Sequence, residues 1–144
     1  MGIMTSYNID NWIIQFPQEW KMSLDKETGQ VIFDVDEGAV NIYVSTMNFK
    51  RPETGEIASV EIVSSFVLQA FEQQGVQEYD GFSKYYPKDY VTYAGRRITE
   101  DGFEMTACAI CTVGCVLMIY VVGDKGIDFE KYIQYIQLIG QDSF

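Results

Sequence analysis

The sequence predicts a single α+β domain, an α/β/α sandwich in which an antiparallel sheet of six to seven strands carries a helix on each face. Three observations predict this class. Seven segments have the composition or alternation of strands, and two have the period of amphipathic helices. The last strand, at 115–122, is apolar on both faces, which places it in the middle of a sheet covered on both sides.

Length and composition limit the possibilities further. The chain has 144 residues and is 47% apolar, which fits one domain, 1–144, with one hydrophobic core. The formal net charge is −11. An acidic chain is a poor partner for nucleic acid or for an anionic membrane, because both are bound through Lys and Arg. The charge is explained by solubility or by a basic protein partner.

The first half of the chain is predicted to form four strands and a helix. The strands are expected at 12–16, 20–24, 30–35 and 39–47. Between 57 and 74 the apolar residues recur with the helical spacing i, i+3, i+4, i+7. They are Val60, Val63, Phe66, Val67, Ala70 and Phe71. Ser59 or Thr54 is the expected N-cap, and Gly75 suits the end of the helix.

The second half is predicted to form a three-stranded meander and a final helix. The segment 78–89 is aromatic and irregular, and strands are expected at 90–99, 103–112 and 115–122. The last helix is expected at 127–139, ended by Gly140. Its apolar stripe consists of Phe129, Ile133, Ile136 and Ile139.

Two hairpin turns predict which side chains share a face. If Asp101-Gly102 is a two-residue loop, Ile98 pairs with Met105. Arg96 then shares a face with Met105 and Ala107 and needs an acidic partner there. If Val113-Gly114 is another, Thr112 pairs with Cys115 and Ile110 with Leu117. One face then carries Met105, Ala107, Ala109, Val116, Met118 and Tyr120, and the other carries Cys108, Ile110, Leu117, Ile119 and Val121.

This order of elements resembles the PsbP-like superfamily, also called the Mog/PsbP fold. The resemblance rests on an aromatic-Pro-x-x-Trp turn, Phe16-Pro17-Gln18-Glu19-Trp20, and on the strand at 40–45 before a helix, a meander and a terminal helix. It implies a bacterial protein of uncharacterised function that binds rather than catalyses. Members resemble photosystem accessory subunits, partners of a small GTPase or chaperones of secreted effectors. They share no functional residue that can be carried over.

Motifs for catalysis and for cofactors are missing from the sequence. Histidine is absent, which removes His-dependent triads and most zinc sites. Cys108, Cys111 and Cys115 have a spacing that suits a metal or an iron–sulfur cluster. Cys108 and Cys111, however, are three apart on one strand and therefore point to opposite faces, so we interpret all three as buried structural residues. We therefore expect that the protein is not an enzyme and that it binds neither a metal nor a cofactor.

We interpret the acidic clusters as solvated residues of turns, without a role in catalysis or metal binding. The segment 34–38 lacks the twelve-residue loop of a calcium site. Glu100, Asp101 and Glu104 flank the Asp101-Gly102 turn, where we expect them to be solvated.

The predicted interaction surface is a tyrosine-rich segment at 79–90. Its candidate residues are Tyr79, Phe82, Tyr85, Tyr86 and Tyr90. Tyrosine is enriched at interface hot spots because its rigid ring offers a large contact area. The alternative is that these rings fold back and seal the edge of the core.

The sequence therefore predicts a non-enzymatic protein-binding module of a bacterial cytoplasm, such as an immunity protein or an effector chaperone. The longest apolar run, at 116–122, is too short to span a bilayer, and the first ten residues lack the pattern of a signal peptide. Residues 1–6 match the loose N-myristoylation pattern, which many chains match by chance. The alternative function is a small-ligand pocket, or a cryptic enzyme, between the helix at 57–74 and the sheet.

Overall fold

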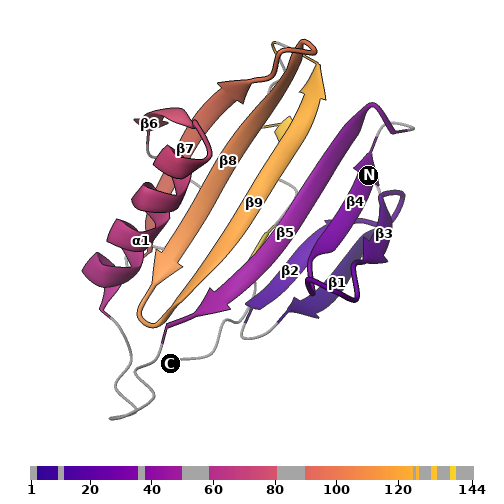
Figure 1. Ribbon diagram of the computed structural model, residues 1–144. Coiled ribbons are helices and arrows are strands. Elements are labelled where there is room, and N and C mark those ends of the chain that lie inside the picture. Colours follow the sequence, from indigo (N-terminus) through magenta and orange to yellow (C-terminus); the bar gives the residue numbers. More distant parts are fainter. Residues whose placement is uncertain are drawn as a thin grey trace.

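The computed structural model describes residues 3–9, 12–35, 38–49, 59–80, 90–124, 126, 131–132 and 137–138. Within them lie a large antiparallel sheet, a smaller sheet and one long helix (Figure 1). The α+β class is confirmed, but the predicted helix on each face is confirmed for one face only. The second face is covered by the smaller sheet.

The main sheet has seven described strands in the order β3-β4-β5-β9-β8-β7-β6. Their bounds are Lys21–Leu24 (β3), Val31–Val35 (β4), Val40–Asn48 (β5), Gln77–Asp80 (β6), Val91–Ile98 (β7), Phe103–Thr112 (β8) and Cys115–Asp124 (β9). All neighbours are antiparallel. The central position of β9 agrees with its apolar character on both faces.

The smaller sheet has the order β1-β2-β10, from strands Met4–Ile9 (β1), Trp12–Pro17 (β2) and Gln137–Leu138 (β10). The strand predicted at 12–16 is therefore present, but it lies in the smaller sheet and not in the main sheet. That strand pairs with β1, which the sequence did not predict, and β6 takes the remaining place in the main sheet. The prediction of irregular structure from residue 78 is correspondingly wrong for 78–80.

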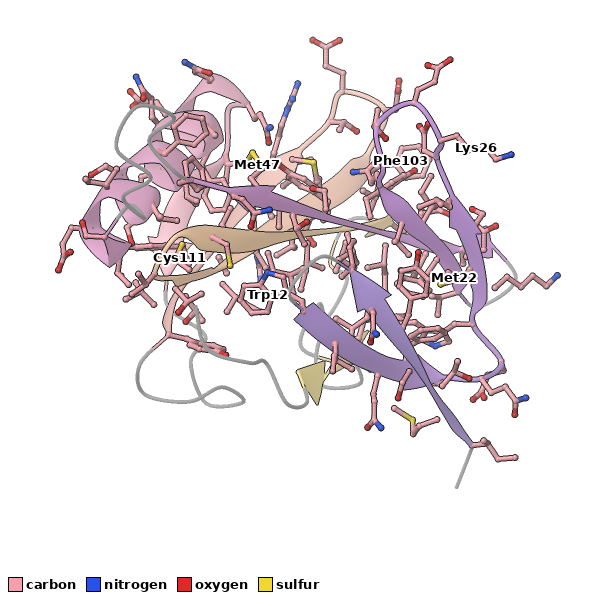
Figure 2. All side chains as sticks on the ribbon, turned by 90° about the horizontal axis from the view of Figure 1, so that it is seen from below. Trp12, Met22, Lys26, Met47, Phe103 and Cys111 are labelled. Atoms are coloured by element: carbon pink, nitrogen blue, oxygen red, sulfur yellow. The ribbon has the colours of Figure 1, made fainter. Side chains whose placement is uncertain are left out.

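The space between the two sheets is filled by large apolar side chains, which we call the sheet-side core. Trp12 and Ile14 from β2 pack there against Phe33, Ile42 and other buried residues of the main sheet. The rings of Phe16 and Phe33 lie 4.6 Å apart between centroids, and those of Trp20 and Phe33 lie 5.6 Å apart. Figure 2 shows Trp12 between the smaller sheet and the main sheet.

The helix α1, Val60–Gln73, covers the opposite face of the main sheet. Ser59 is its N-cap and accepts a hydrogen bond from the Ile62 N–H. Of the two predicted N-caps, Ser59 is therefore the one confirmed. Gly75, at φ +75°, follows its end in a conformation that favours glycine. Val63, Val67 and Phe71 pack on small residues of β8 and on β9, and this group is the helix-side core.

One predicted hairpin register is correct, and the other is wrong by one residue. The β8–β9 register pairs Thr112 with Cys115 and Ile110 with Leu117, and both predicted faces of this hairpin are confirmed. In β7–β8, Ile98 pairs with Glu104 instead of Met105.

The β7–β8 loop has three residues instead of two. Thr99 N–H donates to the Phe103 carbonyl, the Thr99 hydroxyl accepts from Phe103 N–H, and Gly102 adopts φ +89°. A three-residue loop with glycine in the left-handed region is the next most common hairpin, and it shifts the register by one.

The predicted helix at 127–139 is wrong at its C-terminal end. Residues 131–132 are helical and Tyr132 is buried in the sheet-side core, but Gln137–Leu138 is a strand that pairs with β2. The remaining residues of this prediction, with all four residues of its apolar stripe, lie outside the described residues. In the described part of the chain, no helix has both the length and the apolar character needed to cross a membrane.

Candidate interaction surface

The tyrosine-rich segment lies largely outside the described residues. This applies to Phe82, Tyr85 and Tyr86, whereas Tyr79 belongs to strand β6. Tyr90 is half-buried and packs against the sheet-side core. Its ring meets that of Trp12 edge to face, with 5.8 Å between the centroids. At Tyr90 the ring therefore packs inward, as the alternative of a core seal predicts.

The three cysteines lie in two separate cores. Cys108 and Cys115 are buried on the sheet side, and Cys111 is buried on the helix side. Burial raises the pKa of the Cys108 thiol well above its usual range. Burial also raises the pKa of Cys111 to about 11. The Cys108 and Cys111 thiols therefore stay protonated at neutral pH, and the position of Cys111 on the face opposite Cys108 and Cys115 prevents all three from converging on one ion.

Glu104 is buried, which contradicts the prediction that it is a solvated residue of the turn. Only 3% of its side chain is exposed, and its Oε1 lies 3.7 Å from Nη1 of Arg96. Its Oε2 accepts a hydrogen bond of 3.2 Å from Gly126 N–H. The carboxylate thus holds the chain that leaves β9 against the surface of β8. We interpret Glu104 as a structural tether.

The shifted register also corrects the environment of the two arginines. Arg96 lies across from Thr106 and finds its acidic partner, Glu104, on the sheet-side face instead of the face of Met105. Arg97 takes the place across from Met105, and its Nη1 donates to the Gln74 carbonyl at 3.0 Å. A guanidinium at the C-terminal end of α1 satisfies a free carbonyl and complements the helix dipole. Arg97 therefore anchors α1 to β7.

One group of exposed apolar side chains in the described part of the chain lies where α1 comes close to the β8–β9 turn. Ile62 and Phe66 are one helical turn apart on α1 and are 49% and 46% exposed. The Phe66 ring packs edge to face on Phe49, with 5.0 Å between centroids, and Phe49 N–H donates to the Gly114 carbonyl at 2.7 Å. Val113, also exposed, precedes that glycine in the turn. We call Phe49, Ile62, Phe66 and Val113 the helix–hairpin surface.

The charge around the helix–hairpin surface is negative on α1. Glu61 lies beside Ile62 in the first turn of α1, and Glu72 is exposed near its end. The sequence of α1 contains neither lysine nor arginine. Figure 1 shows the N-terminal end of α1 close to the turn between β8 and β9. The surface is apolar, and Glu61 supplies one negative charge at its border on the helical side.

The space between α1 and the sheet is filled in the described part of the chain. Val63, Val67 and Phe71 are fully buried, and they face Ala107 and Ala109, which are also fully buried. Small residues on β8 let the helix approach closely, so that its apolar side chains reach the sheet. This packing gives no support to the alternative of a ligand pocket between helix and sheet.

Sequence reasoning missed the helix–hairpin surface because it assigned Phe66 to the buried stripe of the helix. The buried residues are Val63, Val67 and Phe71, spaced four apart, so that Phe66 falls at the margin of the stripe. An aromatic residue at that margin, beside an exposed Ile62, was the signal available in the sequence. Glu104 was missed for another reason: its place beside a hairpin turn suggested a solvated side chain, whereas the structure buries it next to Arg96.

Comparison with known proteins defines the class of fold. The chain is similar to the solution structure of cyanobacterial PsbP (CyanoP) from Synechocystis sp. PCC 6803, with a TM-score of 0.60. The match covers 96% of this chain and 94% of the other at 11% sequence identity. No protein-family model matches, and no curated protein matches. The fold is therefore PsbP-like, as the resemblance implied, and the likeness extends to the fold alone.

Proposed function

We propose that this chain is a non-enzymatic protein-binding module that docks a partner on the helix–hairpin surface. The observation that carries the proposal is the contact of Phe66 with Phe49 at the exposed margin of α1. Exposed apolar side chains are ordinary when scattered singly, but several of them near a pair of packed aromatic rings are typical of an interface.

The partner is expected to be basic as well as apolar. The net charge of −11 and the acidic residues of α1 favour association with a positively charged surface. An immunity protein that binds a toxin, or a chaperone that binds a secreted effector, fits this description. The tyrosine-rich segment stays a second proposed surface, and it can be tested in parallel.

The proposal is tested by affinity capture from the native host with matched variants. The double substitution Ile62→Ser with Phe66→Ser removes two exposed anchors, and each change is expected to cost less than about 1 kcal/mol because both side chains are about half exposed. The control is Phe103→Ser, since Phe103 is also 46% exposed but belongs to the β7–β8 hairpin. A third variant, Tyr85→Ser with Tyr86→Ser, tests the tyrosine-rich segment.

We expect a partner that is retained by the wild type and by Phe103→Ser and is lost from the helix–hairpin variant. With the purified partner, loss of a hot spot of about 2 kcal/mol or more weakens binding at least about thirtyfold. Loss of binding only in the tyrosine variant would move the site to the other proposed surface. Equal binding by all variants, or no partner at low salt, would contradict protein binding through either surface.

A further inference from the structure

The edge strand β3 presents a free side to its surroundings. It is the first strand in the order of the main sheet and pairs with β4 on one side only in the described part of the chain. All four of its residues are exposed, including Met22 at 40% and Leu24 at 50%. In Figure 1, β3 lies at the edge of the main sheet opposite α1. Natural edge strands are usually protected from pairing by charges, bulges or cover.

The hydrogen bonds of the β3–β4 hairpin determine which backbone groups of β3 are free. Asp25 N–H donates to the Gln30 carbonyl at 2.9 Å, and the register of β3 with β4 continues from that pair. Bonded and non-bonded pairs alternate along an antiparallel ladder. Lys21, Ser23 and Asp25 therefore direct their backbone groups toward β4, whereas Met22 and Leu24 direct theirs outward.

Successive side chains of β3 point to opposite faces of the sheet. Met22 lies across from Phe33 and Leu24 across from Val31, and both residues of β4 are buried in the sheet-side core. Met22 and Leu24 thus continue the apolar face of the main sheet to its edge, where they remain substantially exposed. Figure 2 shows Met22 on the strand at this edge. Lys21, Ser23 and Asp25 occupy the opposite face.

We propose that β3 pairs in antiparallel register with β3 of a second copy of this chain, around a two-fold axis at Ser23. The segment Lys21-Met22-Ser23-Leu24-Asp25 complements its own reverse. Lys21 of each copy meets Asp25 of the other, and Met22 meets Leu24 on the apolar face. Met22 and Leu24 carry the outward backbone groups, so each Met22–Leu24 pair exchanges both of its hydrogen bonds. The opposite charges, the apolar contacts and the outward backbone hydrogen-bonding groups are thus all paired in the same register.

The second copy is favoured over a foreign strand by this charge complementarity. A symmetric pair requires the same patch to fit itself, and a strand with a lysine at one end and an aspartate at the other meets that requirement. The contact is small, so we expect a weak dimer with a dissociation constant in the micromolar range or above. It lies on β3, apart from the elements that form the helix–hairpin surface, and does not depend on the proposed function.

Sedimentation equilibrium tests the dimer with the full chain over roughly 10 µM to 1 mM. The wild type is expected to shift from 16.5 kDa toward twice that mass. Lys21→Glu places like charges across both ends of the pair, and we expect dimerisation to weaken at least about tenfold. The matched control is Lys26→Glu, because Lys26 is exposed in the adjacent turn and outside the proposed register. The control should dimerise like the wild type.

A mixing experiment makes the register itself falsifiable. Asp25→Lys alone again sets like charges against each other, so that its dimerisation should also weaken at least about tenfold. Its turn loses the contact from Glu27 N–H to Asp25 Oδ1, so circular dichroism must first confirm that it is folded. An equimolar mixture of Lys21→Glu and Asp25→Lys restores opposite charges at both ends and should form a heterodimer. A monomeric wild type at 1 mM, an unaffected Lys21→Glu variant, or a mixture that stays monomeric would each overturn the proposal.

Discussion

The two faces of the main sheet are covered by different kinds of structure, and the difference explains where apolar surface remains exposed. On one face, the smaller sheet brings Trp12, Phe16 and Ile14 against the main sheet, and these side chains are buried. On the other face, α1 is the only long helix in the described part of the chain. A helix is about 10–12 Å across and spans only two or three strands spaced about 4.8 Å apart.

The narrow cover on the helix side has a visible consequence. α1 packs on β8 and β7, whereas half-buried residues such as Tyr43 and Met47 of β5 lie on the same face farther across the sheet. Ile62 and Phe66 stand at the margin of the helix and are exposed. A second sheet can cover many strands of the first, whereas a single helix leaves apolar side chains exposed along its margins. On this face, one such margin forms the helix–hairpin surface.

The largest expected effect concerns the anchor of α1 itself. Phe71→Ala removes a fully buried ring from the helix-side core and should lower the free energy of unfolding by about 3–5 kcal/mol. The control is Phe66→Ala on the same helix, expected to cost less than about 1 kcal/mol because Phe66 is half exposed. Urea denaturation measures both. Equal losses would contradict the division of α1 into a buried stripe and an exposed margin.

A smaller effect is expected from the polar tether on the sheet-side face. Glu104→Ala removes the acceptor of Gly126 N–H and the partner of Arg96, and should cost about 2 kcal/mol. Arg96 is 53% exposed and can be solvated once its partner is lost, which limits the cost. Glu100→Ala, in the exposed turn, serves as the control and should stay within about 0.5 kcal/mol. If thermal unfolding shows the same midpoint for both, Glu104 is not a tether.

The smallest effect is a loss of stability in alkaline solution. Burial raises the pKa of Cys111 from 9.0 to about 11 in the folded protein, so the unfolded chain releases this proton first. The stabilisation is complete below pH 9 and is lost as the pH rises toward 11. Cys111→Ala should therefore flatten part of the fall in melting temperature over this interval. An unchanged slope would show that Cys111 does not contribute to it.

The sequence predicted those parts of the fold in which local signals were unambiguous. Val113-Gly114 allows a tight two-residue turn, and the faces of β8 and β9 followed from it. Asp101-Gly102 suits loops of two or three residues, and only the contacts of Thr99 with Phe103 decide between them.

Features that depend on distant parts of the chain were less accessible. The short strand β10 pairs with β2, which is far from it in the sequence. Local helical periodicity at 127–139 did not reveal that pairing. The candidate surface had the same difficulty, since the neighbours Phe49 and Phe66 come from different elements.

Hydrogen exchange of the complex with the captured partner tests the central claim most directly. The account predicts that binding slows amide exchange in α1 and in the β8–β9 turn around Val113, and leaves β1 and β2 unchanged. Such protection would locate the partner on the incompletely covered face of the sheet. Protection confined to the smaller sheet would contradict the account, because it would place the binding site on the face that is already closed.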